Sequence, residues 1–176
     1  MKIDISDIIS VENKEMSKKA EIELLDFHSR MGKFPIVNKS SFSLHFSNVE
    51  KKLLKIEGST QVDIEIPCDR CLNGVRITFP ITINKELSIA DLLEHSNSGE
   101  NEEFHYITGT ELDVDKLIFG EILVDWPMKV LCNKDCKGIC NKCGCNLNSE
   151  ECECDRAELD PRMAAIQDIF NKFKEV

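Results

Sequence analysis

Seven of the nine cysteines in this 176-residue chain lie within residues 132–154, and this crowding limits how the segment can fold. Beyond Ile139 and Leu147 the segment has almost no apolar side chains, so no hydrophobic core of its own can stabilise it. The first residues lack the apolar stretch of a secretory signal, so we expect a reducing, cytoplasmic location, and the odd cysteine count also argues against a disulfide framework. Bound metal is therefore the expected source of folding energy.

Thiolates at these spacings are typical ligands of zinc, which takes four of them in a tetrahedron. The other two cysteines form a Cys68-x2-Cys71 pair, which supplies two ligands from one tight turn. The first predicted site, named the proximal site, combines this pair with two cysteines of the cysteine-rich segment 132–154, here called the tail: Cys132 and Cys136. The second, named the distal site, takes four cysteines of the tail: Cys140, Cys143, Cys152 and Cys154. Cys145 is then spare, although it could replace Cys143 or Cys152. We predict one or two structural zinc ions, with an iron–sulfur cluster on the same thiols as a minor alternative.

Two catalytic interpretations of these cysteines compete with the structural one. A catalytic zinc usually has histidine or carboxylate ligands and an open position, but all four histidines lie far from the cysteines in the sequence. A redox pair usually lies at a helix N-terminus, whereas strand patterns flank Cys68 and Cys71 on both sides. The sequence also has no phosphate-binding loop, no G-x-S-x-G motif and no H-E-x-x-H motif. We therefore expect no enzymatic activity, no catalytic residue and no small-molecule substrate.

Apolar residues that alternate with polar ones predict a meander of antiparallel strands between residues 41 and 83. A helix is predicted over 113–125, where Asp113 is a plausible N-cap. Residues 12–30 have a helix-like spacing of charges but a mixed pattern, which predicts no clear element. Residues 91–103 are predicted to form an exposed loop. The loosely alternating isoleucines near the start of the chain favour a short strand.

The predicted fold class is α+β, with an antiparallel sheet, a helix packed on it, a zinc-held cysteine-rich loop and a C-terminal helix. A barrel-like closure of the sheet is one alternative. The terminal helix begins at Asp160-Pro161, where a proline at the first helical position precedes an apolar stripe. The predicted parts are a core domain over residues 1–128, a zinc-binding segment over 129–156 and the terminal helix over 157–176.

The net charge of −10 comes entirely from the second half of the chain. Residues 1–88 carry 13 basic and 13 acidic side chains, whereas residues 89–176 carry 9 and 19. This distribution excludes a generally basic surface that coats nucleic acid, and the acidic segment 91–125 would instead suit a basic protein. Candidate RNA-binding residues are the cations on or beside the predicted strands: Lys51, Lys52, Lys55, Arg70 and Arg76. The alternative is that these side chains only keep the sheet soluble.

Three runs of residues are distinctive: the run from Ile66 to Leu72 (IPCDRCL), the run from Leu131 to Gly144 (LCNKDCKGICNKCG) followed by Asn146-Leu147-Asn148, and the run Cys152-Glu153-Cys154 before Asp160-Pro161-Arg162. In this order they resemble the YceD family, the large ribosomal RNA subunit accumulation proteins. The resemblance covers nearly the whole chain. The second cysteine cluster resembles the Gram-positive type of the family, which has an extended cysteine cluster. Cys145 departs from it, because such sequences usually carry another residue there.

This resemblance implies a cytoplasmic bacterial protein that supports accumulation or processing of large-subunit (23S) ribosomal RNA during ribosome biogenesis. It also implies that Cys68 and Cys71 are the central motif, with Cys132 or Cys136 as partners, and it brings no catalytic residue. The expected partners are the large-subunit rRNA precursor, pre-ribosomal proteins or a processing nuclease, without a membrane. Two alternatives differ in class: a protein-interaction adaptor that never contacts RNA, and a thiol redox or metal-dependent enzyme.

Overall fold

The computed structural model describes residues 1–95 and 106–154. The predicted helix over 157–176 lies outside these described residues, as does most of the predicted loop over 91–103. The described chain divides into two compact units. One unit, here called the sheet unit, comprises Met1–Pro67 and Gly74–Val130. The other, called the cysteine unit, comprises Cys68–Asn73 together with the chain from Leu131 onward.

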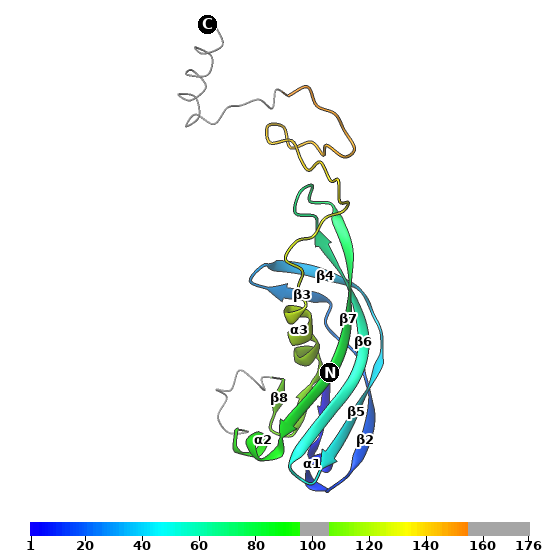
Figure 1. Ribbon diagram of the computed structural model, residues 1–176, viewed down its shortest axis with the longest axis vertical. Coiled ribbons are helices and arrows are strands. Elements are labelled where there is room, and N and C mark those ends of the chain that lie inside the picture. Colours follow the sequence, from blue (N-terminus) through cyan, green and yellow to red (C-terminus); the bar gives the residue numbers. More distant parts are fainter. Residues whose placement is uncertain (96–105, 155–176) are drawn as a thin grey trace, which may run out of the picture. The chain divides into compact units, whose positions relative to one another are not determined.

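The described residues form nine strands and three helices, all in the sheet unit (Figure 1). In chain order the elements are β1 Lys2–Asp4, α1 Ser6–Ser10, β2 Glu15–Ala20, β3 Asp26–Ser29, β4 Gly32–Lys39, β5 Phe42–Val49, β6 Leu53–Pro67, β7 Gly74–Ser88, α2 Ile89–His95, β8 Ile107–Thr108, β9 Glu111–Asp113 and α3 Val114–Val124. The predicted α+β class is confirmed, since the strands of both sheets pair antiparallel.

The long hairpin of β6 and β7 is the backbone of the larger sheet. The two strands pair without interruption from Leu53↔Ser88 to Pro67↔Gly74. Because β6 is 15 residues long, its other edge has room for two partners: β5 along its first part and β4 along its last part. The strand order is β2-β5-β6-β4-β3, with β7 on β6, and no pairing among the described strands closes this sheet into a barrel. The barrel-like alternative is therefore wrong.

The core lies between one face of this sheet and α3 with its neighbours (Figure 1). Alternate residues of β5 and β6, such as Phe46 and Ile56, are fully buried, as their period of two predicts. The predicted helix over 113–125 is confirmed as α3, because the Asp113 carboxylate accepts hydrogen bonds from the N–H groups of Asp115 and Lys116. Phe27 stacks between Phe119 and Trp126, with ring centroids at 4.6 and 4.8 Å.

The structure assigns one segment that the sequence left open and corrects two expectations. The segment 12–30 contributes β2, which pairs with β5, and β3, which pairs with β4. The short strand expected near the start forms as β1, which contains Ile3, but Ile8 and Ile9 belong to the short helix α1. Residues 91–95 belong to α2 rather than to a loop. For β1 and β2, pairing with strands distant in the sequence sets the local conformation, which a weak local pattern could not predict.

Candidate metal centre

The loop that joins β6 to β7 is a tight turn which directs two cysteine side chains toward each other. The N–H of Leu72 donates to the carbonyl of Cys68 at 2.9 Å, and the N–H of Cys68 donates to the carbonyl of Asn73 at 2.8 Å. These two bonds fold the Cys68-x2-Cys71 segment back on itself. Both thiols are buried, so the turn supplies two preorganised ligands away from solvent.

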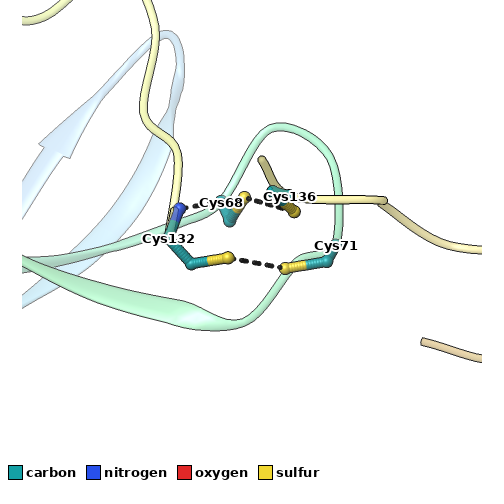
Figure 2. A group of neighbouring side chains, drawn as sticks. All are labelled: Cys68, Cys71, Cys132 and Cys136. Atoms are coloured by element: carbon teal, nitrogen blue, oxygen red, sulfur yellow. Dashed lines mark hydrogen bonds between the residues drawn. The ribbon is translucent and has the colours of Figure 1, made fainter. Parts of the chain in front are cut away.

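The tail brings two more sulfurs to this turn, as predicted for the proximal site. The four sulfurs of Cys68, Cys71, Cys132 and Cys136 all lie within 4.8 Å of one another and point into one small space (Figure 2). Cys68 and Cys136 have their sulfurs 3.8 Å apart, and Cys71 and Cys132 have theirs 3.4 Å apart. A tetrahedral zinc with bonds of about 2.3 Å needs sulfurs about 3.8 Å apart. The group therefore fits a zinc ion in both ligand type and spacing.

The pKa values of the four thiols also favour the binding of a cation. Burial raises the pKa of the Cys68 thiol, but the backbone N–H groups of Arg70, Cys132 and Cys71 donate to its sulfur and lower that pKa to about 6. Hydrogen bonds to the sulfurs of Cys71 and Cys136 raise the pKa of Cys132 to about 12. The four sulfurs thus share protons between thiolates and thiols. A divalent cation can replace these shared protons and neutralise half of the charge of four thiolates.

A second layer of polar side chains holds these ligands in place. Arg70 donates from Nη1 to the carbonyl of Cys136 at 2.8 Å, and its own carbonyl accepts the N–H of Ile139 at 3.1 Å. Asn148 donates from Nδ2 to the Cys136 sulfur at 3.4 Å, and its Oδ1 accepts the N–H of Lys137. Sequence reasoning did not assign Asn148 this role, although the Asn-x-Asn pair after the cysteines was visible. Such partners orient ligands and stabilise thiolates.

The same turn recurs at the start of the distal group. Gly144 donates its N–H to the carbonyl of Cys140 at 2.9 Å, and Cys140 donates its N–H to the carbonyl of Cys145 at 2.8 Å. These two hydrogen bonds join residues at the same sequence separations as the two hydrogen bonds of the Cys68 turn. Gly144 therefore corresponds to Leu72, and Cys145 corresponds to Asn73. Gly144 has a φ of +75°, a left-handed conformation that glycine adopts without steric penalty. The cysteine unit therefore contains two copies of one ligand-bearing turn.

The distal group differs from the predicted ligand set in one member. The four sulfurs that lie within 4.8 Å of one another belong to Cys140, Cys143, Cys145 and Cys152. Cys145 joins them because the left-handed Gly144 reverses the chain directly after Cys143. Cys154 is not in this group, although its thiol hydrogen-bonds with those of Cys143 and Cys152, which together with burial raises its pKa to about 12. In this structure Cys145, rather than Cys154, thus completes the group of four mutually close sulfurs, and the assignment of the four distal ligands stays a prediction.

Both groups consist of cysteines alone, so within the described residues no histidine or carboxylate joins them. Four thiolates complete a tetrahedron and leave no position for water or substrate. The Cys68 turn lies between two strands, as predicted, and not at a helix N-terminus. Chemically, this arrangement suits a structural metal that fastens Cys68–Asn73 to the tail.

Within the sheet unit, the candidate RNA-binding cations lie at two separate places, three lysines at the start of β6 and Arg76 near the start of β7. Lys51 and Lys52 lie in the turn between β5 and β6, whereas Arg70 belongs to the cysteine unit. Lys55 pairs with Glu86 at 2.7 Å, and Arg76 pairs with the buried Asp63 at 3.3 Å. Along the β6–β7 ladder, Lys55 and Arg76 are ten register positions apart, which is roughly 30 Å. The sheet unit thus offers no single patch built from these residues, and their contact with RNA stays a prediction.

A family model described as "Large ribosomal RNA subunit accumulation protein YceD" matches residues 56–170, which include every cysteine of both groups. The chain belongs to the YceD family. The Arabidopsis thaliana relative named "Large ribosomal RNA subunit accumulation protein YCED homolog 1, chloroplastic" is 24% identical over 72% of this chain and 47% of its own length.

Two bacterial relatives of this YceD-family chain are uncharacterized. The Bacillus subtilis protein YlbN is 25% identical over 73% of each chain, and a Mycobacterium leprae protein is 24% identical over 74% of this chain and 58% of its own. The chain thus spans about half the length of the Arabidopsis relative. No solved structure was found to match it. In the part of the chain that the structure describes, no helix is long and apolar enough to cross a membrane.

Proposed function

We propose that this protein is a non-enzymatic, cytoplasmic factor that supports accumulation of large-subunit ribosomal RNA, and that it depends on two structural zinc ions. The observation that carries the proposal is the proximal group of four cysteines. Its ligands come from two segments about sixty residues apart in the sequence, and the YceD family model spans both of them. A metal there would fix the end of the β6–β7 hairpin loop to the tail.

Zinc is proposed over other metals because of its ligands. Eight thiolates in two closed tetrahedra suit a redox-inert ion that serves folding, and the cysteine-rich tail has almost no apolar residues to fold on. When bound, zinc would supply the folding energy that this tail lacks. The residues that would hold it are Cys68, Cys71, Cys132 and Cys136 in the proximal site. In the distal site they are Cys140, Cys143, Cys145 and Cys152.

The role in ribosomal RNA accumulation is supported by the family description and by the name of the Arabidopsis relative. A protein of this kind would act as a binding factor in the assembly of the large subunit, by contact with precursor RNA, with pre-ribosomal proteins or with a processing nuclease. The groups of four cysteines support a non-catalytic role for the metal, since an ion bound by four thiolates would have no open position for water or substrate.

The test measures metal and RNA in the same variants. The purified protein should contain two zinc ions per chain, and Cys68→Ser combined with Cys71→Ser should contain one. In a bacterial host whose own copy is replaced, that variant should lower mature large-subunit rRNA relative to small-subunit rRNA. The control Leu25→Ala changes an exposed side chain of the sheet unit and should leave both quantities unchanged. Normal large-subunit rRNA in the double variant would overturn the proposal, as would a reversible Cys68–Cys71 disulfide in the native protein.

A further inference from the structure

Leu72 has a backbone conformation that is unfavourable for leucine. Its φ is +63°, and it follows Cys71 in the same place at which Gly144, with φ +75°, follows Cys143. Glycine has no steric penalty in this conformation, whereas a branched side chain has a substantial one. The second copy of the turn has glycine at this position, so the turn itself does not require leucine. The presence of leucine at position 72 therefore needs another explanation.

The side chain of Leu72 does not pack into the cysteine unit, since 65% of its surface is exposed. The nearby Ile139 is 41% exposed, and its N–H binds the carbonyl of Arg70, two residues before Leu72. Gly138 lies so close to this loop that an added Cβ would be 3.1 Å from the same carbonyl. Both apolar side chains are thus exposed on loops that are hydrogen-bonded to each other next to the proximal site. Backbone strain is found most often at functional sites, so a left-handed leucine with an exposed side chain points to a contact.

The net charge of the cysteine unit indicates the chemistry of the partner. The described residues of the cysteine unit carry four basic and five acidic side chains. Two zinc ions on eight thiolates would add four negative charges, which gives about −5. Three of the acids, Glu150, Glu151 and Glu153, are exposed. Such a surface repels the phosphates of RNA and attracts a lysine- and arginine-rich protein segment.

We propose that the cysteine unit is a docking surface for a basic protein segment, with Leu72 and Ile139 as its apolar contacts and the net negative charge of the unit as the attraction that guides the segment to it. The charge rests on the zinc ions of the proposed function, and the partner would be a protein of the large subunit rather than its RNA. Burial of a leucine side chain on binding commonly changes affinity by tenfold or more.

Leu72→Gly is the decisive variant, because it removes the side chain and also relieves the left-handed strain. It should keep two zinc ions and lose at least tenfold in affinity. Leu72→Met, which keeps an apolar side chain, should retain most of the affinity. Glu150→Gln combined with Glu151→Gln should weaken binding, and added salt should weaken it in every variant. Leu25→Ala serves as the control, since Leu25 is 75% exposed in the sheet unit.

The probes are individually purified large-subunit ribosomal proteins and, in parallel, protein-free large-subunit rRNA, with binding followed by calorimetry. The proposal expects at least one basic protein to bind in a way that depends on Leu72. It is overturned if no protein shows this dependence, or if the rRNA binds and Leu72→Gly abolishes that binding. Zinc content is measured first on the unmodified protein. A chain that binds less than two zinc ions would contradict the proposed metal role, whatever the docking result.

Discussion

The guanidinium of Arg70 donates a 2.8 Å hydrogen bond from Nη1 to the carbonyl oxygen of Cys136. This bond crosses from the Cys68 turn to the tail, so it joins the two segments that supply the proximal ligands. Arg70 was a candidate for RNA binding from sequence, because it is a cation beside the predicted strands. Its contact with Cys136 shows that at least part of the side chain has a structural role in positioning a ligand.

Arg70→Ala is expected to weaken zinc binding at the proximal site by about tenfold, since loss of an outer partner of a metal ligand typically has an effect of this size. The measurement is competition with a chromogenic chelator. Arg76→Ala is the matched control, because Arg76 pairs with Asp63 on the sheet and touches no ligand. Equal zinc affinities of the Arg70 variant and the unmodified protein would contradict a positioning role for Arg70.

Zinc retention should depend on pH in a defined direction. The pKa of Cys68 is lowered to about 6 by the N–H groups that donate to its sulfur, so the thiolate persists above that pH. Bound zinc competes with this proton, so the ion should leave only at a pH below the metal-free value of about 6. We therefore expect proximal zinc to be retained at pH 7 and to be lost progressively on further acidification, measured as metal remaining after dialysis. Release that is complete at pH 7 would contradict this.

The large sheet and α3 could be predicted because their patterns are strong and local. Strict apolar alternation in β7, and alternation at both ends of β6, indicate one buried face, and the Asp113 cap marks the start of a helix that forms as expected. β2 could not be predicted, because its burial pattern alternates only weakly and its register is set by pairing with β5. The bulge between Ile36 and Asn38 in β4 likewise depends on its partner β6.

Asn48 is a buried polar residue whose hydrogen-bond partners could not be predicted from the sequence. It is buried at the end of β5, where its Nδ2 donates to the carbonyls of Ile8 and Ile9 at 2.7 and 3.1 Å. Its Oδ1 accepts the N–H of Lys51 at 3.0 Å. The alternation of buried residues along β5 places Asn48 on the inward face, but it does not identify the groups that satisfy the amide. The carbonyls that accept from Nδ2 lie about forty residues away, on α1.

Asn48→Ala should therefore destabilise the sheet unit by about 1–3 kcal/mol, because it leaves buried carbonyls without a donor. Urea unfolding followed by the fluorescence of Trp126 measures the change, since this tryptophan stacks on Phe27 in the core. The control Asn84→Ala removes an exposed asparagine from β7 and should change stability by less than about 0.5 kcal/mol. Equal stabilities of the two variants would show that Asn48 does not hold α1 on the sheet.

The proximal ligand set could be predicted from spacing and resemblance together, whereas the distal set could not. Five cysteines lie near one another there, and only the backbone decides which four converge. The left-handed turn at Gly144 brings Cys145 to the sulfurs of Cys140, Cys143 and Cys152, and no spacing rule distinguishes this choice from Cys154.

Cys145→Ser and Cys154→Ser separate these two ligand sets. If Cys145 is the fourth distal ligand, the Cys145→Ser variant should bind one zinc ion per chain and the Cys154→Ser variant should bind two. In the unmodified zinc-loaded protein, Cys154 should then be the one thiol that reacts with a maleimide, and Cys154→Ser should abolish that reaction. Metal analysis and mass spectrometry measure both quantities. The reverse pattern, in which Cys154→Ser loses a zinc ion and Cys145→Ser does not, would restore the ligand set predicted from the sequence.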